Sequence, residues 1–205
     1  NLMDALDQRM LERSCALIAK LAAAGIPDPR ISINMSGTRL GDPKIVERIM
    51  ATTGHFAVQP RQLVLEILET TLLDDRSAHV DENLRRLVDA GFALELDDFG
   101  TGHAAIANLR KYPLERIKID RSLVAGIDRD VDLVMITSAI TNLARSLGLK
   151  VLAEGVETDA ELEMLQQIGC TCVQGYLYSR PMPLSRLLFW LKEHERTAPR
   201  GALAS

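Results

Sequence analysis

The sequence predicts an α/β fold of the TIM-like (β/α)8 barrel class, because short apolar strands alternate with helices along nearly the whole chain. Two further observations favour a closed barrel over an open doubly wound sheet. No glycine-rich Gly-x-Gly-x-x-Gly motif follows a strand, and polar residues end nearly every strand rather than one of them. A barrel has eight strands in about 250 residues. Since only six strands are recognisable, we expect this chain to lack the first two.

In the first half of the chain, helices and strands alternate with clear start and stop residues. Helix formers with helical periodicity run up to Gly25, which ends the first helix. Asp42 offers an N-cap and Pro43 a first-turn proline for the second helix, and Gly91 ends the third. The expected elements, in order, are a helix over 2–24, a strand over 30–35, a helix over 44–51, a strand over 62–68 and a helix over 77–90.

The second half continues the alternation. Pro113 separates a short helix from the strand after it, and Gly148 ends a long helix. Thr158 and Glu161 have the spacing of a capping box. The expected elements are strands over 92–98, 116–120, 150–154 and 171–174, and helices over 104–111, 131–147, from about 158 to before Gly169, and 184–195. We expect a barrel domain over residues 1–195 and a disordered tail over 196–205.

Composition narrows the function classes. With 205 residues, of which 47% are hydrophobic, the chain can bury a sizeable core as one globular domain. A net charge of −4 argues against long nucleic acid as a partner, but not against a small phosphorylated ligand held by metal ions. Cys15, Cys170 and Cys172 fit neither a zinc ribbon nor a thioredoxin-like pair, so we expect reduced thiols in a cytoplasmic protein.

No apolar stretch is long enough to span a bilayer. Because the chain starts at Asn1, we expect it to be a piece of a longer protein, whose upstream part could carry a membrane tether.

Polar side chains at the ends of the strands predict a functional site. A charge in a strand that is buried on both faces costs several kcal/mol or more unless it is paired. Repeating that cost on successive strands indicates one shared site at the carboxyl ends of a parallel sheet. The residues are Asn34, Glu66, Asp97, Asp98, Lys118, Asp120, Glu154 and Gln174. Most of them offer only oxygen ligands, which suits Mg²⁺ or Mn²⁺ and disfavours zinc.

These groups also have structural interpretations. Asp97 and Asp98 precede two glycines and could form a simple turn. In the functional interpretation, Asp97 points into the barrel mouth and Asp98 onto its rim, so that each reaches one of two cations about 4 Å apart. Lys118 could form a structural ion pair with Asp120 or Glu95. The regular placement of the set favours the shared site.

With these motifs the chain resembles the EAL family, the phosphodiesterases of the bacterial second messenger cyclic di-GMP. The resemblance implies a TIM-like barrel that hydrolyses cyclic di-GMP to linear pGpG with two Mg²⁺ or Mn²⁺ ions. It covers the chain from the first helix to about Pro183. The matching segments are Ile33-Asn34-Met35-Ser36, Leu65-Glu66-Ile67-Leu68-Glu69, Asp97-Asp98-Phe99-Gly100-Thr101-Gly102, Lys118-Ile119-Asp120, Ala153-Glu154-Gly155-Val156-Glu157-Thr158, Gln174-Gly175-Tyr176 and Ser179-Arg180-Pro181.

The resemblance also implies residue roles and partners. Glu154 orients or deprotonates the attacking water, Lys118 is a partner of that water or of the phosphoryl charge, and Glu69 braces the loop after Asp98. A homodimer and an upstream sensor or diguanylate cyclase domain are further implied partners. The implied metal ligands are Asn34, Glu66, Asp97, Asp98 and Glu154, and the implied substrate-binding or supporting residues are Asp120, Glu157, Gln174, Arg180 and Pro181.

Two departures from the family pattern leave an alternative open. The Glu-Ala-Leu tripeptide, whose glutamate is a metal ligand in the family, is absent together with the front strands. His103, Ala104 and Ala105 stand where the family usually has a tyrosine and two serines. The alternative is a degenerate receptor that binds cyclic di-GMP without cleaving it. A lyase or racemase barrel of the enolase type is a third hypothesis, which the tandem aspartates fit poorly.

Overall fold

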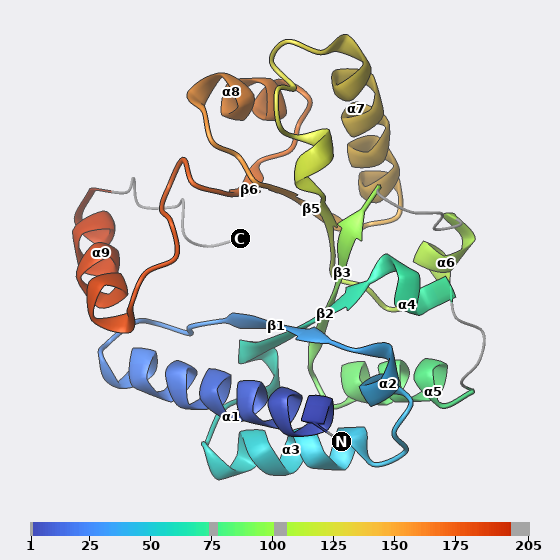
Figure 1. Ribbon diagram of the computed structural model, residues 1–205, viewed down its shortest axis with the longest axis vertical. Coiled ribbons are helices and arrows are strands. Elements are labelled where there is room, and N and C mark those ends of the chain that lie inside the picture. Colours follow the sequence, from blue (N-terminus) through green and yellow to red (C-terminus); the bar gives the residue numbers. More distant parts are fainter. Residues whose placement is uncertain (1, 74–77, 101–105, 198–205) are drawn as a thin grey trace.

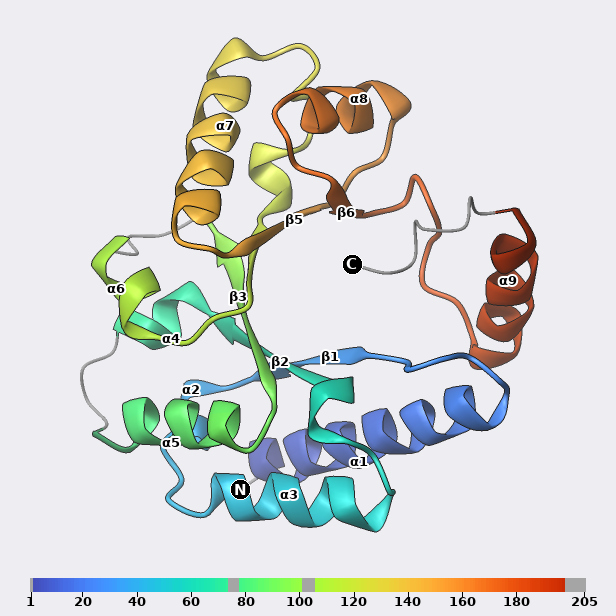
Figure 2. The ribbon, with the colours of Figure 1, turned by 180° about the vertical axis from the view of Figure 1, so that it is seen from behind.

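The computed structural model describes residues 2–73, 78–100 and 106–197, and in this part of the chain six parallel strands form one sheet in chain order. The sheet is curled and the helices lie on its outer side (Figures 1 and 2). This arrangement confirms the predicted α/β class, with the strands curled as part of a barrel. The strands are β1 (Ile31–Met35), β2 (Leu63–Leu68), β3 (Ala93–Phe99), β4 (Arg116–Ile119), β5 (Lys150–Glu154) and β6 (Cys172–Gln174).

The expected helices are present, with bounds that differ by a few residues. They are α1 (Leu2–Ala23), α3 (Ile45–His55), α5 (Ala78–Asp89), α6 (Ile106–Lys111), α7 (Val131–Ser146), α8 (Asp159–Gln167) and α9 (Leu184–Thr197). Because α9 runs to Thr197, the first two residues of the predicted tail are helical, and the rest of that tail lies outside the described residues. Among the helices described, none has the length and apolar character needed to cross a membrane.

Four short elements were not predicted. Two are helices, α2 (Gly37–Leu40) and α4 (Glu69–Leu73), and two are 3-10 turns, η1 (Pro60–Gln62) and η2 (Arg121–Leu123). Ser36 begins α2 because its side-chain oxygen accepts a hydrogen bond from the Arg39 amide at 3.3 Å. These elements follow the carboxyl ends of strands or precede their amino ends, so they shape the rims of the barrel.

The alternation of side chains along β2 shows how the fold positions polar groups inside. Leu63, Leu65 and Ile67 are fully buried and belong to the large hydrophobic core between the sheet and the helices. Val64 and Glu66 alternate with them and therefore lie on the other face of the strand, toward the barrel interior. The packing of the apolar face thus fixes Glu66 inside.

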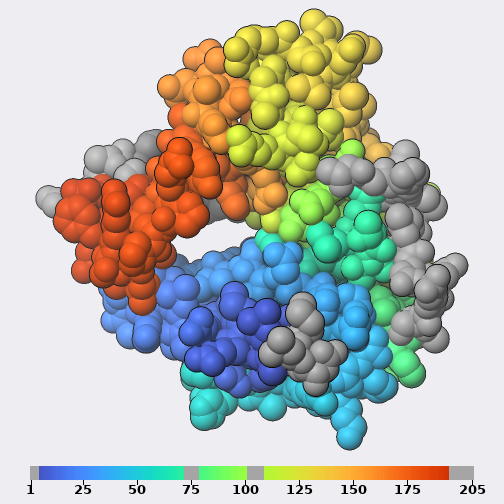
Figure 3. Space-filling view, viewed as in Figure 1, coloured from blue at the N-terminus to red at the C-terminus, as the bar shows by residue number. Residues whose placement is uncertain are grey.

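The interior is buried over the central strands and open at the two ends of the sheet. Figure 3 shows a hollow between the segment that carries α9 and the region of α1 and β1. Asn34 on β1 and Gln174 on β6 are exposed. In contrast, Lys118 on β4 is only 5% exposed and Glu66 on β2 only 8%. Charged groups on the middle strands therefore face a poorly hydrated environment and need partners.

Candidate metal and active site

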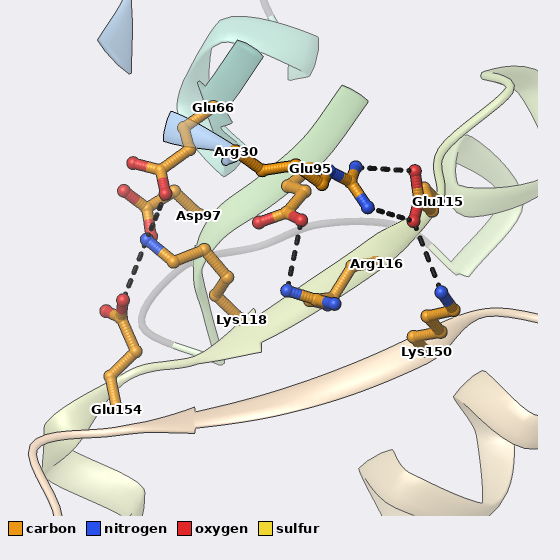
Figure 4. A network of polar contacts seen from close by, with 9 residues as sticks. All are labelled: Arg30, Glu66, Glu95, Asp97, Glu115, Arg116, Lys118, Lys150 and Glu154. Carbon is orange, nitrogen blue, oxygen red and sulfur yellow. Dashed lines mark hydrogen bonds and ion pairs between the residues drawn. The ribbon is translucent and has the colours of Figure 1, made fainter. Parts of the chain in front are cut away.

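Lys118 on β4 lies at the centre of a cluster of carboxylates from three other strands. Its Nζ is 2.8 Å from Glu66 Oε1, 2.8 Å from Asp97 Oδ1 and 2.7 Å from Glu154 Oε1 (Figure 4). Each carboxylate comes from a different strand, respectively β2, β3 and β5, and all lie toward the carboxyl ends. The sheet thereby brings together four of the residues predicted to share a site.

The lysine is held charged by this cluster. Burial acts to lower the pKa of Lys118, but hydrogen bonds to Asp97, Glu154 and Glu66 outweigh it, so the pKa lies above its usual value. One ammonium nevertheless faces three carboxylates that are largely buried. The cluster therefore keeps an excess of negative charge that a bound cation can neutralise.

A bulge in β3 places the tandem aspartates. Leu96 pairs with Ile117 of β4 and Phe99 pairs with Ile119, so three steps along β3 match two steps along β4. Asp98 has φ +55, a left-handed conformation that aspartate tolerates better than most residues. In a regular strand the side chains of Asp97 and Asp98 would point to opposite faces, and the extra residue removes that constraint.

As a result Asp97, Asp98 and Glu154 converge. One carboxylate oxygen from each lies within 4.8 Å of the other two. Burial raises the pKa of Asp98, and the charges of Asp97 and Asp120 raise it further. Burial likewise raises the pKa of Glu154, despite its ion pair with Lys118. In both groups burial disfavours the ionised form more than the charge of Lys118 favours it.

This donor set fits divalent cations. All the ligand atoms are carboxylate oxygens, the preferred ligands of hard cations such as Mg²⁺, Ca²⁺ and Mn²⁺. The excess of carboxylates over the single lysine supplies the charge that such cations neutralise. Asp97, Asp98 and Glu154 are three of the five metal ligands that the sequence resemblance implies.

Glu69 contacts the beginning of the loop that follows the aspartates. Its side chain is 3% exposed, and its Oε2 accepts a hydrogen bond from the Gly100 amide at 3.2 Å. Gly100 has φ +102, a backbone conformation that favours glycine. The contact has the form expected of a brace. The remainder of the loop, residues 101–105, lies outside the described residues, and with it the substitutions at His103, Ala104 and Ala105.

Two acidic residues near the cluster have other partners. The Asp120 carboxylate accepts a hydrogen bond from the Ser122 amide at 2.9 Å and thereby caps η2. Hydrogen bonds from the side chain and the amide of Ser122 lower the pKa of Asp120 despite partial burial. Glu157 forms an ion pair with Arg121 at 2.7 Å. These residues border the site, and the alternative of a Lys118–Asp120 ion pair is replaced by the three carboxylates described above.

The remaining predicted residues lie on the exposed margins. Asn34 is opposite Glu66 in the β1–β2 register, and Gln174 is opposite Glu154 in the β5–β6 register. Both are therefore at the level of the carboxylates, on strands beside them. Arg180 lies over the ring of Tyr176, 4.7 Å from its centroid, in the exposed segment after β6 that includes Pro181. That contact does not join Arg180 to the Lys118 cluster.

The structure adds charged residues that the sequence analysis did not assign to the interior. Arg116 lies two residues before Lys118 on β4, and its Nη1 is 3.2 Å from Oε1 of the buried Glu95 (Figure 4). Farther toward the amino ends, Glu115 pairs with Arg30 at 3.1 Å and with Lys150 at 3.3 Å. The alternation of Arg116 and Lys118 on one strand was the available clue, since residues two apart share a face.

Comparisons with known proteins agree with this geometry. A family model described as EAL domain matches residues 1–181. The chain is 36% identical to the cyclic di-GMP phosphodiesterase NbdA of Pseudomonas aeruginosa, over 94% of this chain and 24% of that protein. The chain spans about a quarter of the length of such curated relatives.

Solved structures of other proteins are also similar to this chain. The structure of the PaMucR phosphodiesterase in a c-di-GMP complex superposes with a TM-score of 0.84 and 33% identity, over 91% of this chain and 75% of that chain. A manganese/cy-diGMP complex of Klebsiella pneumoniae BlrP1 superposes with a TM-score of 0.78 and 29% identity, over 86% of this chain and 44% of that chain.

Proposed function

This chain belongs to the EAL domain family, and on that premise we propose that it provides the site for metal-dependent hydrolysis of cyclic di-GMP to linear pGpG. The observation that carries the proposal is the convergence of Asp97, Asp98 and Glu154 within 4.8 Å, next to the buried Lys118. Such a cluster can bind divalent cations through its carboxylates and a phosphoryl group through its lysine. The similar proteins named for this activity support the choice of substrate.

We propose Mg²⁺ or Mn²⁺ as the cations, two of them. Asn34, Glu66 and Asp97 would hold the first, and Asp97, Asp98 and Glu154 the second. When bound, the cations supply Lewis-acid polarisation of the phosphodiester and activation of a water molecule. The manganese complex of the similar protein BlrP1 supports a divalent cation at this kind of site.

The side chains of this chain then have distinct tasks. Glu154, whose pKa is raised by burial, is suited to accept the proton of the attacking water as its oxygen bonds to phosphorus. The bond from phosphorus to one ribose oxygen breaks, and that oxygen takes up a proton. Lys118 keeps its charge and stabilises the negative charge that develops on the phosphoryl oxygens. Asp120, Glu157, Gln174, Arg180 and Pro181 border the mouth as substrate-binding or supporting residues.

The test is turnover by the natural protein that contains this chain. Incubation with cyclic di-GMP and Mn²⁺ should give linear pGpG, separated by chromatography, and chelation of the metal should stop the reaction. Glu154→Gln keeps the size of the side chain but removes the proton acceptor and a metal ligand, so it should lower the rate about 100-fold or more. A wild type without product, or a variant that matches it, contradicts the proposal.

A second candidate is a receptor that binds cyclic di-GMP without cleaving it. The substitutions at His103, Ala104 and Ala105 favour it, because they alter the loop that follows the metal-binding aspartates. Calorimetry separates the two functions. Binding of cyclic di-GMP that persists in EDTA, without turnover in Mn²⁺, supports the receptor, whereas turnover rejects it.

The family membership also supports three proposals about the whole protein. We propose a barrel domain over residues 1–195, a homodimer, and an upstream sensor or diguanylate cyclase domain. We propose a cytoplasmic location, which fits three cysteines that are free in the structure, Cys15, Cys170 and Cys172. Light scattering of the natural protein tests the dimer.

A further inference from the structure

Glu161 is a buried carboxylate that binds the backbone of two different loops. It is 5% exposed and lies in the first turn of α8. Its Oε1 accepts a hydrogen bond from the Gly126 amide at 2.9 Å. Its Oε2 accepts hydrogen bonds from the Glu157 amide at 2.9 Å and the Thr158 amide at 3.1 Å. Three backbone donors therefore meet on one side chain.

Helix capping accounts for only part of this arrangement. In the capping box of α8, Thr158 accepts a hydrogen bond from the Glu161 amide at 3.2 Å, and Glu161 accepts one from the Thr158 amide. The bonds from Gly126 and Glu157 are additional. Gly126 belongs to the segment after β4, the strand that carries Lys118, and Glu157 belongs to the segment after β5, which carries Glu154.

A second contact joins the same two segments. Arg121, which follows β4, pairs through Nη2 with Oε1 of Glu157 at 2.7 Å. The methylene groups of Arg121 lie against Gly155, where an added Cβ would clash with Arg121 Cγ. Gly155 also has φ +73, so glycine is needed there for two reasons. The residue directly after Glu154 is thus covered by the segment after β4.

The other side of the segment after β5 is held by β6 and the residues after it. The Val156 amide donates a hydrogen bond to the Gln174 carbonyl at 3.1 Å. The Val156 carbonyl accepts one from the Leu177 amide at 3.0 Å. The backbone beyond Glu154 is therefore fixed from both neighbouring strands, and Glu161 supplies the buried link on the β4 side.

We propose that Glu161 is a positioning residue that fixes the backbone after Glu154 relative to the strand of Lys118, and so sets the affinity of the site for divalent cations. The proposal rests on the proposed function in that it takes Glu154 as a metal ligand. Burial acts to raise the pKa of Glu161, but the three backbone donors outweigh it and the pKa lies below its usual value. The side chain is accordingly an ionised acceptor with both oxygens in use.

The matched test replaces Glu161 by glutamine, which has the same size but only one acceptor oxygen. In Glu161→Gln one of the two loops faces an amide NH₂ instead of an oxygen, so at least one backbone donor is left unpaired. We expect Mn²⁺ to bind the natural protein about 10-fold more weakly in this variant, by titration calorimetry, because displaced supporting groups typically cost this much.

Two control variants separate positioning from capping. Thr158→Ala removes the capping hydroxyl and should lower the thermal unfolding temperature while Mn²⁺ affinity stays within about 2-fold. Glu163→Gln changes an exposed acid two residues farther along α8 and should alter neither property. If Glu161→Gln changes Mn²⁺ affinity no more than Thr158→Ala does, Glu161 is only a helix cap and the proposal is overturned.

Amide hydrogen exchange keeps the two proposals distinguishable. Exchange at Gly126 and Glu157 should both accelerate in Glu161→Gln, while Thr158→Ala should affect mainly the start of α8. If the wild type binds no Mn²⁺, the proposed function fails. The exchange rates then decide the positioning role alone, since acceleration in both loops supports it and unchanged rates overturn it.

Discussion

The two ends of the barrel interior use the same charged residue types in opposite proportions (Figure 4). At the carboxyl ends of the strands, one lysine, Lys118, meets three carboxylates at 2.7 to 2.8 Å. At the amino ends, one carboxylate, Glu115, meets two cations, Arg30 at 3.1 Å and Lys150 at 3.3 Å. Carboxylates are in excess at the first end and cations at the second. Of these two clusters, only the one at the carboxyl ends carries excess negative charge that divalent cations would neutralise.

Burial strengthens the contrast. The side chain of Lys118 is 6% exposed, whereas those of Arg30 and Glu115 are 38% and 31% exposed. Water screens the amino-end pairs, so their contribution to stability is small. It screens the carboxyl-end cluster far less. Between the two ends, the buried Glu95 pairs with the partly buried Arg116 at 3.2 Å, so one negative charge balances one positive charge. The comparison indicates that charge imbalance together with burial, and not charge density alone, marks the functional end.

The largest expected difference between the two ends is in catalysis. Asp97→Asn removes a carboxylate from the carboxyl-end cluster and should lower the rate of cyclic di-GMP hydrolysis by about 100-fold or more, since ligand-sphere changes cost that much. Glu115→Gln makes the equivalent change at the amino ends and should leave the rate within about 2-fold. Both rates are measured with saturating Mn²⁺. Equal losses in the two variants would show that the ends do not differ in function.

The next effect is on stability without metal. Lys118→Met leaves three partly buried carboxylates without their cation, so in EDTA the free energy of unfolding should fall by about 3 kcal/mol or more. Lys150→Met removes one half-exposed cation and should cost less than about 1 kcal/mol. Urea unfolding of the natural protein measures both values. Saturating Mn²⁺ should restore part of the loss in Lys118→Met and none in Lys150→Met.

That comparison is contradicted if the two lysine variants are equally stable in EDTA. It is also contradicted if Mn²⁺ stabilises Lys150→Met more than Lys118→Met relative to the metal-free proteins. Either result would mean that Lys118 is not the main counter-charge of the buried carboxylates.

The smallest effect is on pH dependence, and its sign differs between the ends. The pKa of Glu154 is raised by burial, so without metal the folded protein binds a proton there more readily than the unfolded chain. This contribution reduces stability as the pH rises from the unfolded value, about 4.3, through the higher folded value. The pKa of Glu115 is lowered by its hydrogen bond to Arg30. Its contribution is present above about 4.3 and is lost as the pH falls through the lower folded value.

Unfolding in EDTA as a function of pH tests these signs. Glu154→Gln should weaken the decline in stability toward neutral pH, and Glu115→Gln should weaken the loss of stability in acid. Glu163→Gln, which removes an exposed acid of α8 outside both clusters, is the control. Identical slopes for Glu154→Gln and Glu115→Gln relative to wild type would remove the distinction between the ends.

The sequence predicted the class of fold and most elements because local patterns carry that information. The capping box of Thr158 and Glu161 and the stop at Gly91 depend on residues a few positions apart, and the structure contains the helices they bound. The two short helices α2 and α4 escaped prediction, since four or five residues are too few to show a helical period. The apolar neighbours of Glu66 in β2 indicated that it is poorly solvated, and the packing of Leu63, Leu65 and Ile67 in the core decided that it faces inside.

By itself the sequence determined which residues end the strands, and therefore that Glu66, Asp97, Lys118 and Glu154 share one rim. Only the tertiary structure decided how they meet. Regular alternation would have separated Asp97 from Asp98, and the extra residue in the β3–β4 register brings both toward Glu154. The contact of Glu161 with Gly126 was equally hidden, because Gly126 lies 35 residues away. Strand composition is a local property of the sequence. The register of neighbouring strands and the contacts between distant backbone segments depend instead on how the whole sheet packs against its helices.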